Sequence, residues 1–415
     1  NYFFSNITRE PVAAASLAEV YKATTLDGVE VAVKIQRPGL ENKIALDFYV
    51  LLKLLGLAQW QFQISESIEI VEAVLDEVGA GIFKELDFCT EAAHIQRFKK
   101  LYDRELDELG VVVPSVLRNL SGRQVLVTQW IEGTAPRDLP AAERSALAKT
   151  AVKCLAMQLM SKGFIHCDPH EGNLISLPDG RVALIDFGLM AQMDRGHQEA
   201  MASGVLNIMA QNYEALVDIF LKMGVLDSSR PDLRRPGTTE EFAVALRRCM
   251  SGEAPGTETV QGGAQTKRKL IQAEDGADRR KAFGQLYEEL GELAFSYYFV
   301  IPSYYILVMR AFVTLEGIAL SSKDYTDFNM YSETAVYARR LLLTPQTEGG
   351  RMLLKKALFT KEGRRAVRIG FKGVLPSSKR ALCLAIFALP LKALTAIFKG
   401  LLSFLQKCGK QPSTS

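Results

Sequence analysis

Cysteine and histidine are scarce in this 415-residue chain, which holds six cysteines and four histidines. The cysteines follow no regular spacing, so the sequence predicts no disulfide framework and fits a reducing compartment. His166, Cys167 and His170 cluster, but no second Cys or His pair with zinc-ligand spacing accompanies them. The sequence therefore argues against a disulfide-rich secreted domain and against a zinc centre.

An initiator methionine and a signal peptide are also missing at the start of the sequence. We expect the sequence to be a piece of a longer precursor, with any targeting segment outside it. With 48% hydrophobic residues, the chain can still form a two-lobed core of about 280 to 340 residues plus appendages.

A strong net charge is absent as well, because the formal value is only +3. The charge is uneven: residues 351–410 carry fourteen Lys and Arg against one acid, Glu362, a net +13. Within them, residues 381–405 are mostly apolar, and only Lys392 and Lys399 are charged. This pattern is typical of a segment that enters an anionic membrane surface, either along the interface or as a tilted span. A helix docked on the core is the alternative, and nucleic acid is not expected as a partner because no nucleic-acid-binding motif accompanies the basic residues.

The strongest pattern is HCDPHEGNLISLPDGRVALIDFG, residues 166–188. Asp168 lies five positions before Asn173, and Asp186 opens an Asp-Phe-Gly triplet after an apolar strand. A protein-kinase-like site needs one carboxylate beside the acceptor, and an amide plus a second carboxylate on the metal. We therefore predict ATP and Mg²⁺ as cofactors, with Asp168 as the base or acceptor-orienting group and Asn173 and Asp186 as metal ligands. His166 is expected to brace the loop.

The N-terminal part predicts the lysine of the same kind of site. Residues 12–35 alternate between short strands and turns, and Asp27-Gly28 is a good two-residue hairpin turn. Lys34 ends the strand VAVK and is predicted to contact the α- and β-phosphates, with a role in catalysis.

Glycine is missing from the loop that would cover the phosphates. Counting back from Val20, the three glycine positions of a kinase loop all hold alanine. Alanine still lets backbone amides approach a phosphate but reaches positive φ less easily, so we expect a stiffer loop and altered nucleotide geometry. The residues predicted to form this loop are Ala13, Ala14, Ala15, Ser16, Ala18 and Val20.

Four of these segments together carry a resemblance to a known family. Ala13-Ala14-Ala15-Ser16, the VAVK strand, Glu85-Leu86-Asp87 and the HCDPHEGN loop resemble the UbiB-type atypical kinases over roughly residues 3 to 335. The resemblance implies a kinase-like fold linked to isoprenoid quinone metabolism in bacteria, mitochondria or plastids. It also implies an N-terminal extension that covers the active site, which this sequence begins too late to contain.

The glutamate that would orient Lys34 is not fixed by spacing alone. The resemblance implies Glu91, which lies six residues after Glu85, the first residue of the family's E-x-D motif (Glu85-Leu86-Asp87). It also places Glu85 and Asp87 toward the nucleotide or the covering extension. A merely solvated acidic helix face is the alternative. The glutamates that qualify by sequence are Glu72, Glu77, Glu85 and Glu91.

The rest of the chain predicts the remaining parts of a kinase-like fold. Residues 125–133 read as a strand followed by the link between lobes, where the backbone of Gln129 and Ile131 is expected to meet the adenine edge. A buried helix is predicted from about residue 140 to 162. No A-P-E motif follows the triplet, and helical sequence from about 197 to 223 replaces the segment on which kinases dock peptides.

These observations predict an α+β fold of two protein-kinase-like lobes with a basic, apolar C-terminal helical tail. Residues 1–133 form a small β-rich N-lobe with inserted helices and the hinge. Residues 134–345 form a helical C-lobe with the catalytic loop and a mobile loop at 226–280. Residues 346–415 form the membrane-associating tail. The apolar run at 295–320 is expected as an internal helix pair, although its length allows a membrane span.

Three functions fit the sequence. The preferred one is an atypical kinase or ATPase supporting prenylquinone or related lipid metabolism, with membrane lipids, isoprenoid quinone intermediates and quinone-biosynthesis proteins as partners. The second is a small-molecule phosphotransferase of the aminoglycoside or choline kinase type, and the third is a non-catalytic nucleotide- and lipid-binding scaffold. An organellar membrane is the expected location, with the plastid favoured over the mitochondrion.

Overall fold

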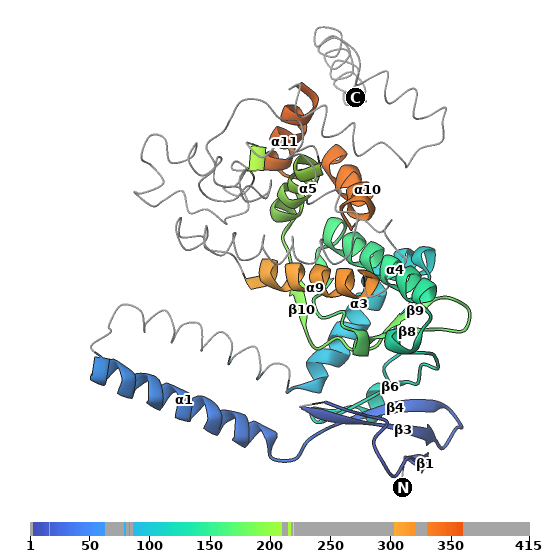
Figure 1. Ribbon diagram of the computed structural model, residues 1–415. Coiled ribbons are helices and arrows are strands. Elements are labelled where there is room, and N and C mark those ends of the chain that lie inside the picture. Colours follow the sequence, from blue (N-terminus) through green and yellow to red (C-terminus); the bar gives the residue numbers. More distant parts are fainter. Residues whose placement is uncertain are drawn as a thin grey trace, which may run out of the picture. The chain divides into compact units, whose positions relative to one another are not determined.

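The structure is a computed structural model (Figure 1) that describes residues 3–15, 17–62, 86–209, 303–320 and 330–359, with residues 79, 83, 215, 216 and 219 between them. The loop predicted at 226–280 and the tail beyond residue 359 lie outside the described residues. Contacts divide the chain into two compact units, which cut across the predicted lobes, so the lobe boundaries stay a prediction. The first unit is Asn1–Leu155, Phe164–Gln192 and Leu307–Ser322, and the second is Ala156–Gly163, Met193–Ile306 and Lys323–Ser415.

A five-stranded antiparallel sheet opens the first unit, in the order β1-β3-β4-β6 with β2 paired to β3. The apolar side chains of Ala23, Val31, Val33 and Val127 alternate along their strands and form its buried core. The strands predicted at 12–35 and 125–133 are thereby confirmed. The strands are β1 (Phe4–Ile7), β2 (Ala13–Ala14), β3 (Ala18–Thr25), β4 (Glu30–Gln36) and β6 (Val125–Gln129).

The predicted hairpin turn joins β3 to β4. Gly28 takes a φ of 83°, a left-handed conformation that glycine adopts without steric cost, and its N–H donates to Thr25 O at 3.1 Å. The turn fixes the register that pairs Val20 with Lys34. Local turn chemistry thus decides which residue of β3 lies beside the lysine.

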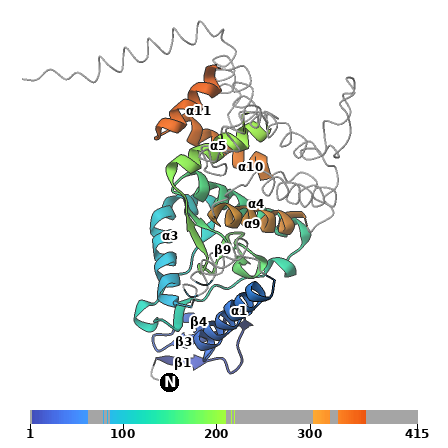
Figure 2. The same cartoon turned by 90° about the vertical axis from the view of Figure 1, so that its left-hand side faces the viewer.

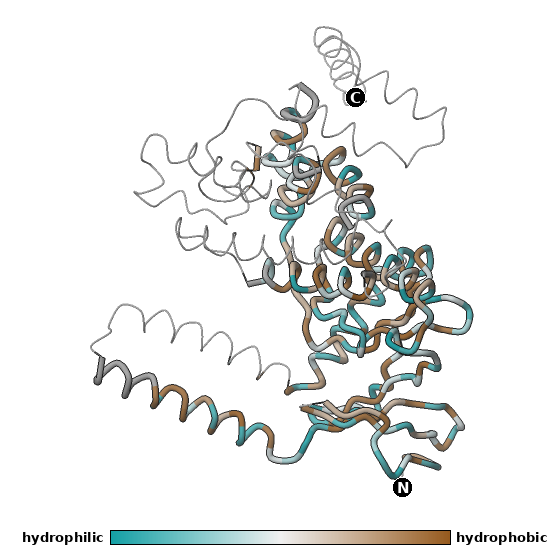
Figure 3. The backbone as a smooth tube through the Cα atoms, in the orientation of Figure 1, coloured by the Kyte–Doolittle hydropathy of each residue, from teal (hydrophilic) through white to brown (hydrophobic). Residues whose placement is uncertain are grey.

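Two long helices follow the strand that carries Lys34. Helix α1 (Leu40–Phe62) projects away from the sheet (Figure 1), and Figure 3 shows hydrophobic stretches along it. Leu46 and Leu54 of this helix are exposed. Helix α3 (Phe88–Leu109) begins beside the sheet and extends away from it (Figure 2). Asp87 caps α3 by accepting from Cys89 N at 2.9 Å, so this member of the E-x-D motif has a structural role at the helix start.

Helix α3 buries one face against the strands that follow it. Ile95, Phe98, Tyr102 and Leu106 recur at helical spacing and are nearly fully buried. The Tyr102 hydroxyl donates to Phe164 O at 2.9 Å, which ties the helix to the strand before the catalytic loop. Apolar packing and this hydrogen bond therefore fix the position of α3.

The segment from Phe164 to Gln192, which contains the predicted catalytic loop HCDPHEGN, folds as short strands around a tight loop. Strand β7 (Phe164–His166) pairs antiparallel with β10 (Met190–Gln192), while β9 (Val182–Leu184) lies between the parallel β5 (Val111–Val112) and the antiparallel β8 (Leu174–Ser176). The helix predicted before the loop is confirmed as α4 (Ala141–Met160). The 3₁₀ turns are η1 (Arg118–Leu120), η2 (Pro136–Asp138) and η3 (Glu171–Asn173).

The second unit is helical where it is described. Helix α5 (Arg195–Met209) packs against α10 (Met330–Leu343) and α11 (Glu348–Phe359). Buried Glu199 of α5 accepts from the backbone N–H of Gln346 at 2.6 Å and from the Thr347 hydroxyl, and so holds the start of α11. The helical sequence predicted from 197 is confirmed as far as residue 209.

Part of the apolar run at 295–320 forms helix α9 (Ser303–Leu320). Within the described part of the chain, no helix is both long and apolar enough to cross a membrane. The structure therefore gives one helix of the expected pair, residues 295–302 lie outside the described residues, and the described part of the run holds no candidate span.

Candidate active site

Lys34 lies on β4 and is the centre of the predicted site. Its Nζ donates to Glu91 Oε1 and Oε2 at 3.1 and 2.9 Å and to Asp186 Oδ2 at 2.7 Å. The three residues come from β4, from the first turn of α3 and from the loop after β9, which are 57 and 152 positions apart along the chain. The fold thus brings together the lysine, a glutamate and the aspartate of the Asp-Phe-Gly triplet.

Glu91 is the glutamate that reaches Lys34. It is 4% exposed, and it also accepts from the Phe187 N–H at 3.3 Å. This contact agrees with the pairing that the family resemblance implied. Glu72, Glu77 and Glu85 lie outside the described residues.

Charge and burial oppose each other in this cluster. Burial disfavours the charged form of Lys34, but the neighbouring Glu91 and Asp186 outweigh it and raise the lysine pKa above its ordinary value. Burial opposes the charge of Asp186 as well, yet Lys34 and the Gly188 N–H hold its pKa below the usual range. Burial and the charge of Asp186 raise the pKa of Glu91. The lysine therefore stays a cation and Asp186 stays an anion, the states that phosphate and metal binding need.

The predicted catalytic loop, HCDPHEGN at residues 166–173, is closed by hydrogen bonds to its own backbone. Asn173 Nδ2 donates to Asp168 O at 2.9 Å, and the His170 N–H donates to the same oxygen at 2.9 Å. The Ile185 N–H donates to Asn173 O at 3.1 Å, which ties the loop to the strand that precedes Asp186. Hydrogen bonds therefore connect Asp168 to Asn173, and Asn173 to the residue that precedes Asp186.

His166 has the structural role that the sequence predicted, but its contacts with Asp186 and Phe187 brace the triplet rather than the loop. Its Nε2 donates to Asp186 O, because a carbonyl can only accept, and its ring lies edge-on to Phe187 with centroids 5.1 Å apart. Burial lowers the pKa of His166, which favours the neutral ring. On the other side, His94 Nδ1 donates to Phe187 O at 3.0 Å. Phe187 is fully buried, so the backbone on either side of it is held in place.

The donor set fits Mg²⁺ in its chemistry. Asn173 uses Nδ2 for the loop bond, which leaves its Oδ1 outside that bond, and Asp186 offers a carboxylate. The described residues contain no group of three or more His, Cys, Asp and Glu placed to hold a metal ion. One carboxylate and one amide are nevertheless typical of Mg²⁺ bound together with substrate phosphates and water. Asn173 and Asp186 stay the predicted ligands.

The alanine loop leads into β3 beside Lys34. Ala13 and Ala14 form β2, exposed and paired with Val20 and Glu19, and the Ala15 N–H donates to Ala18 O at 2.9 Å. Ala18 is buried, whereas Ser16 lies outside the described residues. Ala13, Ala14 and Ala18 are therefore strand residues, and the stiffness of the loop stays a prediction.

Arg37, which sequence reasoning missed, braces this loop. Its Nε donates to Ala15 O at 3.2 Å, and its Nη1 lies 3.1 Å from Glu19 Oε1. The only sequence signal was its position three residues after Lys34.

The predicted hinge follows β6. The Gln129 N–H donates to Ser115 O at 2.8 Å, and the Trp130 N–H donates to Glu30 O at 3.1 Å. Ile131 follows and is half-buried. Gln129 and Ile131 thus lie at the end of the strand next to Lys34's strand, and their contact with adenine stays a prediction.

Arg310 is a second residue that sequence reasoning did not place in the site. Its Nη2 donates to Asp168 Oδ1 at 2.7 Å, across 142 positions of sequence. A signal was present, because Arg310 is a lone basic residue inside the apolar run at 295–320.

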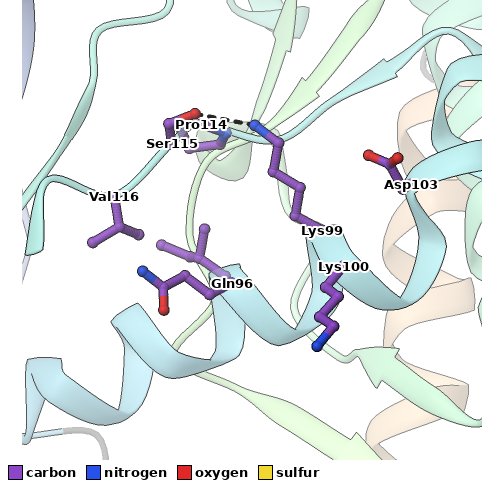
Figure 4. A pocket seen from close by; sticks show the side chains of 8 residues that line it. Gln96, Lys99, Lys100, Asp103, Pro114, Ser115 and Val116 are labelled. Atoms are coloured by element: carbon purple, nitrogen blue, oxygen red, sulfur yellow. Dashed lines mark hydrogen bonds between the residues drawn. The ribbon is translucent and has the colours of Figure 1, made fainter.

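A separate cavity of about 440 Å³ lies between α3 and the segment 114–116 (Figure 4). Lys99 points into it and donates to Ser115 Oγ at 3.0 Å, while Lys100 points away. None of the predicted site residues lines it.

Comparisons with known proteins agree with this geometry. A family model, the ABC1 atypical kinase-like domain, matches residues 1–220. An uncharacterized Synechocystis sp. protein is 30% identical over 365 residues, covering 87% of this chain and 48% of the relative. Protein ACTIVITY OF BC1 COMPLEX KINASE 3, chloroplastic, from Arabidopsis thaliana is 32% identical over 359 residues, covering 82% and 44%. The chain thus spans about half the length of the curated relatives it matches.

A solved structure is also similar. The complex of Rv3197 with erythromycin from Mycobacterium tuberculosis has a TM-score of 0.47 and 24% identity, covering 76% of this chain and 78% of the other. A likeness at this level carries no conclusion about ligands.

Proposed function

The chain belongs to the ABC1 atypical kinase-like family, and on that premise we propose that it binds ATP with Mg²⁺ and works as an atypical kinase or ATPase. The observation that carries the proposal is the contact of Lys34 with both Glu91 and Asp186. A protein kinase needs the lysine–glutamate pair and the triplet aspartate in place together before it can transfer a phosphoryl group.

Each residue has a role in this proposal. Lys34 neutralises the α- and β-phosphates, and Glu91 keeps its amine directed at them. Asn173 and Asp186 hold Mg²⁺, which when bound neutralises charge on the β- and γ-phosphate oxygens. Asp168 accepts a hydrogen bond from the acceptor hydroxyl or water and takes its proton as the new bond forms. Catalysis rests on positioning and charge neutralisation, without a covalent enzyme intermediate.

The alanine loop distinguishes this site from that of ordinary kinases. Extended alanines at positions 13 and 14, with Arg37 on Ala15 O, favour one loop conformation where glycines allow several. We propose that the loop selects among nucleotides by its fixed geometry.

We propose that this activity supports lipid or quinone metabolism at a plastid membrane. Relatives named chloroplastic support the plastid. The membrane proposal rests on the sequence of residues 351–410, with a net charge of +13 around an apolar stretch. Prenylquinone or related isoprenoid metabolism follows from the family resemblance, with membrane lipids, isoprenoid quinone intermediates or quinone-biosynthesis proteins as partners.

The test is Mg²⁺-dependent ATP turnover by the purified chain, with and without anionic liposomes, beside Asp186→Asn. We expect turnover that rises with anionic liposomes, changes little with neutral ones, and disappears in the variant. Equal turnover in the variant would refute the site assignment. Equal turnover with neutral and anionic liposomes would refute the membrane part alone.

A further inference from the structure

Arg310 and Asp168 form an ion pair to which the proposed mechanism assigns no role. Arg310 Nη2 lies 2.7 Å from Asp168 Oδ1, and both residues belong to the first compact unit. Arg310 comes from α9, whose only other charged residue is Glu316. The one basic residue of this mostly apolar helix is therefore directed at the predicted catalytic carboxylate.

Stability does not explain the pair. The side chain of Arg310 is 56% exposed and that of Asp168 is 27% exposed. An ion pair so open to solvent contributes little to folding, because water screens it and two flexible side chains must be ordered. A role in the chemistry explains its placement better.

Asp168 depends on Arg310 for its side-chain orientation. The loop bonds from Asn173 and His170 reach only the backbone oxygen of Asp168. His170 Nδ1 accepts from the Gly172 N–H, and its Nε2 is 3.8 Å from Asp168 Oδ2, beyond hydrogen-bond range. Among the described residues, Arg310 alone donates a hydrogen bond to the carboxylate. This bond ties Oδ1 and leaves Oδ2 for the acceptor.

We propose that Arg310 is a positioning residue that fixes the Asp168 carboxylate for phosphoryl transfer, an inference that rests on the proposed function. Arg310 acts through Asp168: it holds Oδ1 so that Oδ2 meets the acceptor hydroxyl or water in one orientation. A guanidinium suits this task, since its planar set of N–H donors fixes a carboxylate more firmly than a flexible amine does. A misplaced catalytic group can lose about 10²-fold in rate, so the effect should be measurable.

The experiment compares ATP turnover in the wild type, Arg310→Ala, Arg310→Lys, Asp168→Asn and the Asp168→Asn/Arg310→Ala double variant. For Arg310→Ala we expect kcat to fall about 10²-fold while the KM for Mg²⁺·ATP stays within about 2-fold. Arg310→Lys should be intermediate, and added guanidinium should partly restore Arg310→Ala but not Asp168→Asn. The double variant should be no slower than Asp168→Asn, because residues that act as a unit are not additive.

Arg104→Ala is the matched control, since Arg104 is an exposed arginine of the same unit that pairs with Glu108. It should leave turnover unchanged, and thermal melting should show that every variant is folded. Arg310→Ala turnover equal to or above that of the wild type would overturn the inference, and so would an additive loss in the double variant. A wild type without turnover would overturn the proposed function itself, whereas wild-type turnover with no effect of Arg310 would overturn only this inference.

Discussion

Two ion pairs of the site differ in how far water reaches them. The Lys34–Glu91 pair has side chains 22% and 5% exposed, whereas Arg310–Asp168 has side chains 56% and 27% exposed. Burial makes the first pair a structural constraint, because each charge loses hydration that polar groups of the protein must replace. Glu91 and Asp186 do this for Lys34, and Lys34 and the Phe187 N–H do it for Glu91. The second pair keeps its water, so it can serve chemistry without holding the fold together. The comparison predicts that Glu91 supports both stability and activity, whereas Arg310 supports activity alone.

A third ion pair, Arg195–Glu199, has a buried carboxylate but no predicted part in the chemistry. In the second unit, Glu199 is fully buried beside Arg195 and has no predicted part in the site. Glu199→Gln should lower the free energy of unfolding by about 3 kcal/mol, because the carboxylate serves Arg195 and the start of α11 at once. Urea unfolding measures this, and the KM for Mg²⁺·ATP should stay near its wild-type value. A large change in KM without a loss of stability would contradict the separation.

Glu91→Gln should affect both properties. We expect the free energy of unfolding to fall by about 2 kcal/mol. This is less than for Glu199→Gln, because Lys34 keeps Asp186 as a partner. ATP turnover should fall as well, since the amide no longer balances the lysine charge. Glu108→Ala, at an exposed position of the same helix, is the control and should change neither measurement. Equal unfolding curves for Glu91→Gln and the control would remove the structural role from Glu91.

Arg310→Ala should change the unfolding free energy by less than about 1 kcal/mol, since its ion pair is open to solvent. The same protein samples used for turnover can be unfolded in urea. A loss as large as that of Glu91→Gln would show that Arg310 supports the fold, and the contrast between the two pairs would fail.

Ala13→Gly should have the smallest effect of these variants. Ala13 belongs to the loop beside Lys34, so the variant tests the part of the site around the Lys34–Glu91 pair. Glycine adds backbone freedom of about 0.5 to 1 kcal/mol, so the ratio of ATP to ADP affinity should shift a few-fold. Calorimetric binding of both nucleotides measures the ratio. Ala142→Gly on the exposed face of α4 is the control. Unchanged affinities in Ala13→Gly would mean that the alanines do not shape the nucleotide site.

The sequence predicted the local parts of this site well. The β3–β4 hairpin followed from Asp27-Gly28, and the catalytic loop followed from the spacing of Asp168, Asn173 and Asp186. The fold class is confirmed to the level of a kinase-like fold of helices and strands, and the UbiB-type resemblance is confirmed by the family match. These features depend on residues close together in sequence.

The long-range contacts were harder to predict. Four glutamates qualified as partners of Lys34 by sequence alone, because composition does not locate the start of the helix that carries the partner. Arg310 lies 142 positions from Asp168, and only the packing of α9 brings the two together. The nucleotide, the metal and the membrane stay predictions.

The most direct test of the account is calorimetric binding of ATP to the wild-type chain and to Asp186→Asn, with Mg²⁺ and with EDTA. The account predicts that Mg²⁺ tightens ATP binding in the wild type and has no such effect in the variant, while both proteins melt at similar temperatures. Mg²⁺-dependent binding of equal strength in the two proteins would contradict the claim that Lys34, Glu91 and Asp186 form the nucleotide site.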